Sequence, residues 1–279
     1  MDTLQSTTTR LVDPTYPKHL TSLPDGEIAG GNYVTRFART REDLLAIQRL
    51  RFEVFNLELS EGLDASFVTG LDQDEFDLTC HHLMVRDTKS GVVVGTYRVQ
   101  TRAMAASSPV GWYTATEYDL SQLPDWLLDA AVETGRACVA KDHRNGRVLQ
   151  HLWRGLAAYL SWNHKRYLFG CCSLTTQDPH LAKATHEFLA QGGFVRRELA
   201  VRTLPAFECY PPDFEAELDT SVKLPPLFAS YLKLGAKILG SPALDRQFKT
   251  VDYLALLDIQ DLEPHTYRMF FPRRPREQT

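Results

Sequence analysis

The stretch 133-ETGRACVAKDHRNGRVLQHLWRGL-156 places a strand, a basic turn and an amphipathic helix in direct succession. Residues 134–140 are small and apolar, which is typical of a buried strand, and residues 147–163 repeat apolar side chains at helical spacing. The charged residues Glu133 and Arg136 stand where the strand begins. We therefore expect a strand–turn–helix unit with a polar site at the start of its strand.

Similar patterns on both sides of this unit predict the other elements. We expect further strands at 32–38, 81–87, 92–99, 166–172 and 194–203, and helices at about 40–55, 124–130 and 178–191. Strands come first and then alternate with helices, which fits an α/β fold with a mixed, mostly antiparallel sheet covered by helices. We divide the chain into an irregular lead-in (1–30), a main domain (31–210) and an appended C-terminal helical extension packed on it (211–279).

The composition is that of a soluble globular protein, with 43% hydrophobic and 24% charged residues and a net charge of -4. A nucleic-acid-binding protein would carry a basic surplus, so that class is excluded. The five cysteines include no CxxC pair, which favours a reducing compartment over a disulfide framework. The N-terminus does not resemble a signal peptide, and no apolar run could span a bilayer. Residues 227–240 and 272–276 leave peripheral membrane contact open, although a packed helix and a solvated tail are favoured.

Charge is segregated along the chain. Residues 52–85 contain eight carboxylates and no Lys or Arg, whereas residues 136–166 contain seven Lys or Arg and one acid. The stretch 72-DQDEFD-77 precedes a predicted core strand, so its acids need cations beside them. Arg51, Arg98 and Arg136 lie within or beside apolar segments and are the expected partners.

Other kinds of site find little support. Asp72, Asp74, Asp77 and His81 are possible metal ligands, but the spacing is not that of a calcium-binding loop, and we predict no metal. There is no GxSxG or HExxH motif, and the cysteines at 171 and 172 fall in a predicted buried strand, so covalent catalysis is not expected. The basic turn before the helix at 147–163 could bind phosphate, because helix N-termini present free N–H groups.

Several ordered segments resemble one enzyme family. They are 50-LRFEVFNLE-58, 72-DQDEFDLTCHHLMVRD-87, 94-VGTYRV-99, 133-ETGRACV-139, 152-LWRGLAAYL-160, 169-FGCCS-173, 224-LPPLFASYLKLGAKI-238 and 244-LDRQFKTVDYLALL-257. Together they resemble the acyl-carrier-protein-dependent amino-acid N-acyltransferases, the ornithine-lipid-type or hemolysin-like branch of the GNAT superfamily. A more distant similarity is to acyl-homoserine-lactone synthases, which usually carry Glu where this chain has Asp72.

The resemblance implies a GNAT-like fold and assigns roles to individual residues. Glu133 and then Asp72 are the candidate bases, because an amine attacks a thioester only when neutral. Arg136 belongs with them in the predicted catalytic group. The substrate-binding set is Arg51, Asp74, Asp77 and Arg98, together with backbone donors around Cys138, Val139 and Ala140. Residues expected to meet the carrier protein and its pantetheine arm are Lys141, Arg144, Gly146, Arg147 and Arg154. An apolar groove for the acyl chain would involve Leu152, Trp153, Leu156 and Phe169.

The implied reaction transfers a long-chain, 3-hydroxylated or plain, acyl group from acyl-carrier-protein to the α-amine of an amino acid such as ornithine. Acyl-carrier-protein is a co-substrate and no cofactor is bound. The resemblance also implies a cytoplasmic bacterial enzyme of lipid biosynthesis, with contact at the inner membrane face left open. Two alternatives remain: a coenzyme A-dependent GNAT N-acetyltransferase, whose usual Q/R-x-x-G-x-G/A loop is incomplete here after Arg144, and a non-catalytic lipid- or protein-binding module.

Overall fold

The computed structural model describes residues 16–211, 213–215 and 222–271. Its strands form one sheet in the order β1-β2-β3-β4-β5-β6-β9-β7, with β8 also paired to β9. They are β1 (Ile28–Gly30), β2 (Tyr33–Phe37), β3 (His81–Asp87), β4 (Val93–Thr101), β5 (Ala131–Val139), β6 (Tyr167–Leu174), β7 (Lys237–Ile238), β8 (Ala243–Asp245) and β9 (Thr250–Asp258). Neighbouring strands pair antiparallel except for β5 and β6, which are parallel.

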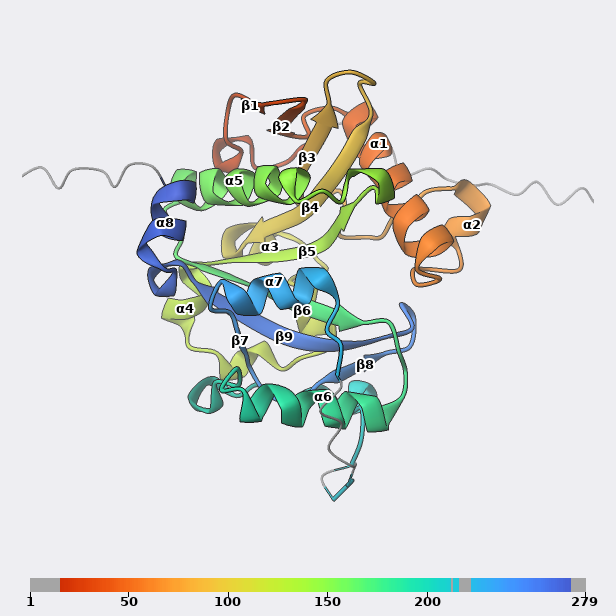
Figure 1. Ribbon diagram of the computed structural model, residues 1–279, viewed down its shortest axis with the longest axis vertical. Helices are drawn as coiled ribbons and strands as arrows, with labels where there is room; N and C mark the ends of the chain where they lie inside the picture. The colour runs from red at the N-terminus through yellow and green to blue at the C-terminus, as the bar shows by residue number, and fades with distance from the viewer. Residues whose placement is uncertain (1–15, 212, 216–221, 272–279) are drawn as a thin grey trace, which may run out of the picture.

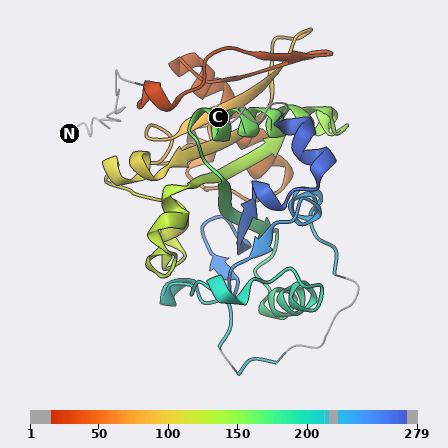
Figure 2. The ribbon, with the colours of Figure 1, turned by 90° about the vertical axis from the view of Figure 1, so that its left-hand side faces the viewer.

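Helices cover both faces of this sheet (Figures 1 and 2). One face carries α5 (Arg147–Trp162), α6 (Pro179–Gln191), α7 (Pro226–Lys233) and α8 (Pro264–Phe270). The other face carries α1 (Arg41–Arg51), its π-helical continuation η2 (Phe52–Glu58) and α4 (Asp125–Asp129). The short α2 (Ser66–Thr69) follows η2, and α3 (Arg102–Ser107) follows β4. Single 3-10 turns are η1 (Leu20–Ser22), η3 (Thr114–Thr116), η4 (Leu120–Gln122), η5 (Lys141–His143), η6 (Arg197–Leu199), η7 (Pro205–Phe207) and η8 (Ile259–Asp261).

The arrangement confirms the predicted mixed, mostly antiparallel sheet flanked by helices. The strand–turn–helix unit that begins at Glu133 is present as β5, η5 and α5. The helix expected near residue 40 begins with a capping box, in which Thr40 and Asp43 each bond the other's backbone N–H. The sequence therefore locates most elements that surround the site.

Two expectations near the C-terminus differ from the structure. Residues 194–203 do not form a strand: Val195 makes one isolated bridge, and η6 follows it. The place beside β6 belongs instead to β9, which pairs with β6 from Tyr167↔Asp258 to Leu174↔Val251. Residues 211–279 are therefore not a purely helical extension, since they supply three strands of the sheet as well as α7 and α8.

The structure also describes part of the lead-in and one of the two segments considered for membrane contact. Residues 28–30 of the lead-in form β1, and residues 1–15 lie outside the described part of the chain. In α7, Phe228 and Leu232 are buried, which agrees with a packed helix. The basic tail at 272–276 lies outside the described residues. Within the described ranges, no helix is long and apolar enough to cross a membrane.

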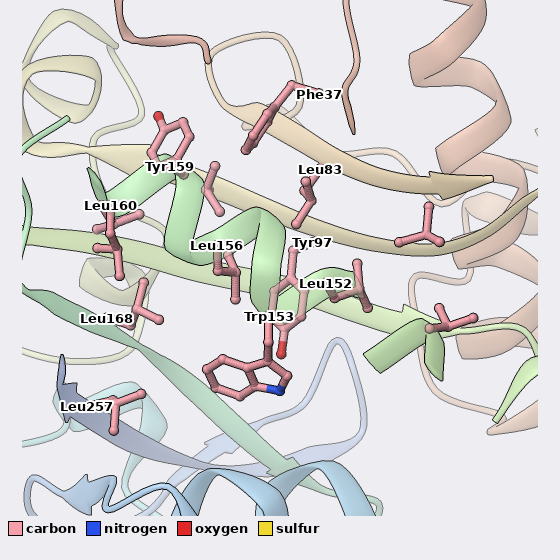
Figure 3. Packing of buried hydrophobic residues seen from close by; sticks show 14 of the residues in the cluster. Phe37, Leu83, Tyr97, Leu152, Trp153, Leu156, Tyr159, Leu160, Leu168 and Leu257 are labelled. Carbon is pink, nitrogen blue, oxygen red and sulfur yellow. The ribbon is translucent and has the colours of Figure 1, made fainter. Parts of the chain in front are cut away.

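The main core fixes α5 against the sheet (Figure 3). Leu152, Leu156 and Tyr159 of α5 pack into the same cluster as Leu83 and Tyr97 from the strands. Gly155 allows this close approach, because a Cβ there would lie 2.5 Å from Leu83 Cδ1. The N-terminus of α5 is thus held beside the end of β5, where the strands part.

Candidate active site

The sheet opens between β5 and β6. These parallel strands pair only from Ala131↔Tyr167 to Glu133↔Phe169 and then separate. On its other edge β5 carries a bulge: Gly135 faces Arg98 and Cys138 faces Thr96, so two residues of β5 oppose one of β4. One of the two is Arg136, whose φ is 49°. The parting of the strands and the bulge create a cavity of about 480 Å³.

This cavity reaches both faces of the sheet. Because side chains alternate along a strand, Leu168 and Cys172 of β6 point to the α5 and α7 face, whereas Phe169 and Cys171 point to the opposite face. All four line the cavity. The residues expected to form the acyl groove, Leu152, Trp153, Leu156 and Phe169, are all in its wall. A chamber that passes through the sheet can hold two substrates from opposite sides.

Two glycines shape the opening. A Cβ on Gly170 would lie 2.1 Å from the carbonyl oxygen of Thr134, so only glycine allows β6 to pass β5 at this point. A Cβ on Gly135 would meet no atom within 4 Å, and this residue borders the cavity. Gly170 therefore serves the packing of the strands, whereas Gly135 leaves space for a ligand.

The charges predicted from the sequence meet beneath the bulge in one buried network, here called the arginine–aspartate cluster. Its members are Arg51, Asp72, Asp74, Asp77, Arg98 and Arg136. Arg51, at the end of α1, donates from Nε to Asp72 (2.7 Å) and from Nη1 to Asp77 (2.7 Å). Arg98 on β4 donates to both oxygens of Asp74 at 2.6 Å. Three guanidinium groups and three carboxylates balance in charge.

The arginines lower the pKa of two of these carboxylates, Asp74 and Asp77. Burial by itself would raise the pKa of Asp74, but Arg98 and Arg136 outweigh it and hold that pKa well below its usual range. Burial and Arg51 oppose each other in the same way at Asp77, whose pKa is also lowered. The cluster therefore stays charged and internally paired at neutral pH, which suits a rigid support.

Arg136 is one of the two members of the cluster that line the cavity. Its guanidinium lies 3.7 Å from the ring centroid of Phe248 and 5.9 Å from that of Tyr113. It donates to Asp74 at 3.2 Å, and its Nε has no hydrogen-bond partner among the described residues. Arg136 and Arg98 both line the cavity, so they are the arginines of the cluster within reach of a bound anion.

Glu133 and Asp72 do not occupy the position expected of a base. Glu133 accepts hydrogen bonds from the backbone N–H groups of Tyr113 (3.1 Å) and Thr114 (2.6 Å) and from Gln100 Nε2 (2.5 Å). Asp72 is completely buried against Arg51. Neither residue lines the cavity. In the structure Glu133 fixes the loop that carries Tyr113, and Asp72 fixes Arg51. The base role of both stays a prediction.

A second group of buried carboxylates was missed by sequence reasoning. Glu117, which precedes η4, and Asp252 on β9 lie together beside Cys171, with one ligand atom of each within 4.8 Å of the others. We call Glu117 and Asp252 the acid pair. Burial raises the pKa of Asp252 to about 7, with Asp245 contributing. Burial, followed by Asp252, raises the pKa of Glu117 well above its usual value.

Another acid missed by the sequence reasoning is Glu61. It lines the cavity, and burial raises its pKa. Thr175 donates a hydrogen bond to it. The charge pattern placed Glu61 in the acidic segment 52–85, but its contact with Thr175, just after β6, depends on tertiary structure.

The remaining predicted site residues divide between the cavity and the surface. Cys138 and Val139 line the cavity, whereas the N–H of Ala140 is already bonded to the carbonyl oxygen of Val94 at 2.9 Å. Ala140 is therefore removed from the predicted oxyanion donors. Arg144 and Gly146 also border the cavity, and Arg144 pairs with Glu58 at 2.6 Å. The other cations of the predicted carrier-protein set are exposed outside the cavity lining: Lys141, Arg147 and Arg154.

The chain is similar in sequence to known acyltransferases. Residues 50–154 match the family described as an acetyltransferase (GNAT) domain. The chain is 33% identical over 246 residues to the L-ornithine N(alpha)-acyltransferase of Brucella abortus, covering 82% of this chain and 85% of that protein. It is 32% identical over 255 residues to the Rhodobacter capsulatus enzyme of the same name, covering 87% and 96%. Among solved structures, the AHL synthase LasI aligns with a TM-score of 0.48 at 13% identity, over 90% of this chain and 100% of LasI.

A mixed sheet that opens beside a bulged strand, together with the family match at residues 50–154, defines a GNAT-like fold. Within that fold class, the chain belongs to the L-ornithine N(alpha)-acyltransferase family. It is therefore an N-acyltransferase with an acyl donor and an amino-acid acceptor, as the sequence resemblance predicted.

Proposed function

We propose that the enzyme transfers a long-chain acyl group, 3-hydroxylated or plain, from acyl-carrier-protein to the α-amine of ornithine. The product would be an N-acyl amino acid that serves as a lyso-aminolipid. The observation that carries the proposal is the through-sheet cavity, whose part between α5 and α7 is walled by Leu152, Trp153, Phe228 and Tyr231. Such an apolar chamber suits an alkyl chain much longer than acetyl. The names of the relatives support ornithine as acceptor.

The donor is proposed to enter beside the N-terminus of α5. Arg144 and Gly146 border the cavity there, and Lys141 and Arg147 lie exposed next to them. These cations would attract the acidic surface of a carrier protein, which mainly raises the rate of encounter. The pantetheine arm would then run along the open edge of β5 toward the bulge. Such a donor implies a reaction in the bacterial cytoplasm, with the lipid product leaving at the inner membrane face.

The acceptor is proposed to bind on the opposite face, with its carboxylate at Arg136. Its α-ammonium must lose a proton before the nitrogen attacks the thioester carbon. Glu61 replaces Glu133 and Asp72 as the proposed proton acceptor, because it borders the cavity and has a raised pKa. Collapse of the tetrahedral intermediate breaks the C–S bond and forms the amide. The thiolate leaves with the proton that Glu61 received, and the attacking nitrogen releases its second proton to solvent as the amide forms.

The test uses purified enzyme, L-ornithine and long-chain acyl-carrier-protein, with the N-acyl product measured by mass spectrometry. Gly135→Leu fills the cavity at the bulge and should lower kcat/KM ~100-fold or more while the protein remains folded, because a blocked site loses the aligned geometry. Gln150→Leu adds the same side chain on the exposed side of α5 and should leave activity unchanged. Acylation by acetyl coenzyme A in preference to long-chain acyl-carrier-protein would overturn the proposal.

A further inference from the structure

The acid pair is buried without a cation beside it among the described residues. Glu117 is 1% exposed and Asp252 is 3% exposed. Among the residues that the structure describes, no Lys, Arg or His forms an ion pair with either of them. Glu117 Oε1 and Asp252 Oδ1 also lack any hydrogen-bond partner there. Two buried carboxyl groups with unused oxygens are costly unless a cation joins them.

The pair is reachable from the substrate cavity. Asp252 and Cys171 are part of the cavity wall, on the same side of the sheet as Arg136. Tyr113 lies between the two regions: the guanidinium of Arg136 is 5.9 Å from the centroid of its ring, and Tyr113 interacts electrostatically with Glu117. Glu61 interacts electrostatically with both Arg136 and Asp252. A cation at the acid pair would therefore be one tyrosine side chain away from an anion at Arg136.

We propose that Asp252 and Glu117 bind the side-chain ammonium of a diamino-acid acceptor whose α-carboxylate is held by Arg136. The assignment rests on the proposed function, because it presumes an amino-acid acceptor in this cavity. Two carboxylates at one site favour the protonated form of an amine. They suit the amine that stays charged during the reaction and not the α-amine, which must become neutral to attack. The pair thus selects diamino acids and also directs which of their two amines is acylated.

A divalent metal is the competing occupant, since Glu117, Cys171 and Asp252 are within coordinating distance of a common point. Metal binding by cysteine requires the thiolate. Burial, followed by the charges of Glu117 and Asp252, raises the pKa of the Cys171 thiol well above its usual value. An ammonium needs only the two carboxylates and leaves the thiol protonated, which favours it over a metal.

The experiment compares L-ornithine with L-norvaline, which has the same carbon chain without the δ-amine. Wild-type enzyme should acylate ornithine with a kcat/KM at least ~10-fold higher, because norvaline leaves the acid pair unpaired. Asp252→Asn should raise KM for ornithine by a similar factor and leave norvaline within about twofold, which removes the preference. Asp258→Asn takes a carboxylate from the same strand, outside the cavity lining, and should keep the preference.

The outcomes separate this inference from the proposed function. Equal use of ornithine and norvaline by the wild type would overturn the acid-pair assignment while leaving acyl transfer to amino acids intact. Failure to acylate either compound would overturn the proposed function itself. If Asp252→Asn does not fold, two other measurements test the same preference. One compares ornithine with norvaline as acceptors for Glu117→Gln. The other measures how far each amino acid shifts the melting temperature of the wild-type enzyme. Tight Zn²⁺ binding that is lost in Glu117→Gln would show a metal site and overturn the ammonium assignment.

Discussion

Two groups of buried carboxylates lie on the same face of the sheet, and they differ in what neutralises them. In the arginine–aspartate cluster, Asp72, Asp74 and Asp77 are matched by three guanidinium groups. In the acid pair, Glu117 and Asp252 have no ion-pair partner among the described residues. The first group is complete within the protein and acts as a support. The second becomes complete only with a cationic ligand, which is the behaviour expected of a binding site.

The comparison predicts that removing a cation from the cluster is severely destabilising. Arg51→Met leaves Asp72 and Asp77 buried without their main partner, so we expect a loss of about 3–5 kcal/mol in the free energy of unfolding. Urea denaturation followed by circular dichroism measures it. Arg102→Met removes an arginine that pairs with Asp125 and Asp129 at the surface and should hardly move the urea midpoint. Similar midpoints for the two variants would contradict the supporting role of the cluster.

The acid pair should respond to pH in the opposite direction from the cluster. The pKa of Asp252 is raised to about 7, so folding favours its protonated form and wild-type stability falls as pH rises from about 4 to 7. Asp252→Asn lacks this penalty. The free energy of unfolding of the variant, relative to that of the wild type, should therefore rise by on the order of 2–4 kcal/mol from pH 4 to pH 8. Unfolding curves at both pH values test this. A constant difference between the two proteins would show that Asp252 is not held protonated.

A substitution of Glu133 should have a smaller effect, and it tests whether this carboxylate stabilises the fold or takes part in the reaction. Glu133→Gln keeps the shape of the side chain and weakens the bonds from the N–H groups of Tyr113 and Thr114, with an expected cost of about 1–2 kcal/mol. Because Glu133 is outside the cavity lining, kcat should fall by no more than about tenfold. A variant of unchanged stability that has lost nearly all activity would instead restore Glu133 as the base.

The sequence predicted the arginine–aspartate cluster well and the acid pair not at all. One short segment contains Asp72, Asp74 and Asp77, and clear apolar patterns are interrupted by Arg51 and Arg98. The local sequence was therefore enough to predict the cluster. Asp252 is one of two acids within 250-TVDYLALLD-258, a stretch assigned to a helical extension. Its partner Glu117 lies in a segment for which no strand or helix was expected. The pairing of β6 with β9 places Asp252 beside β6, and Glu117 reaches the same place through its contact with Cys171. Contacts over such sequence distances leave no local signal.

The roles within the site were also beyond sequence reasoning. The pattern around Glu133 and Arg136 identified the correct strand, yet neighbouring residues of that strand have different roles. Side chains alternate between faces, and the bulge changes the direction of those that follow. Whether Glu133 acts as a base or as a support depends on which backbone N–H groups lie near it. Those groups belong to the loop around Tyr113, whose course the sequence did not indicate.

The parting of β5 and β6 also governs the order of events during turnover. A cavity with walls on both faces of the sheet accommodates donor and acceptor together, so neither must leave before the other arrives. Direct transfer in a ternary complex requires no acyl-enzyme, and initial-rate plots for the two substrates should intersect. A single molecule joining an acyl-pantetheine to the α-nitrogen of an amino acid would thread the sheet from one side to the other. Such a compound would combine the binding energies of both substrates.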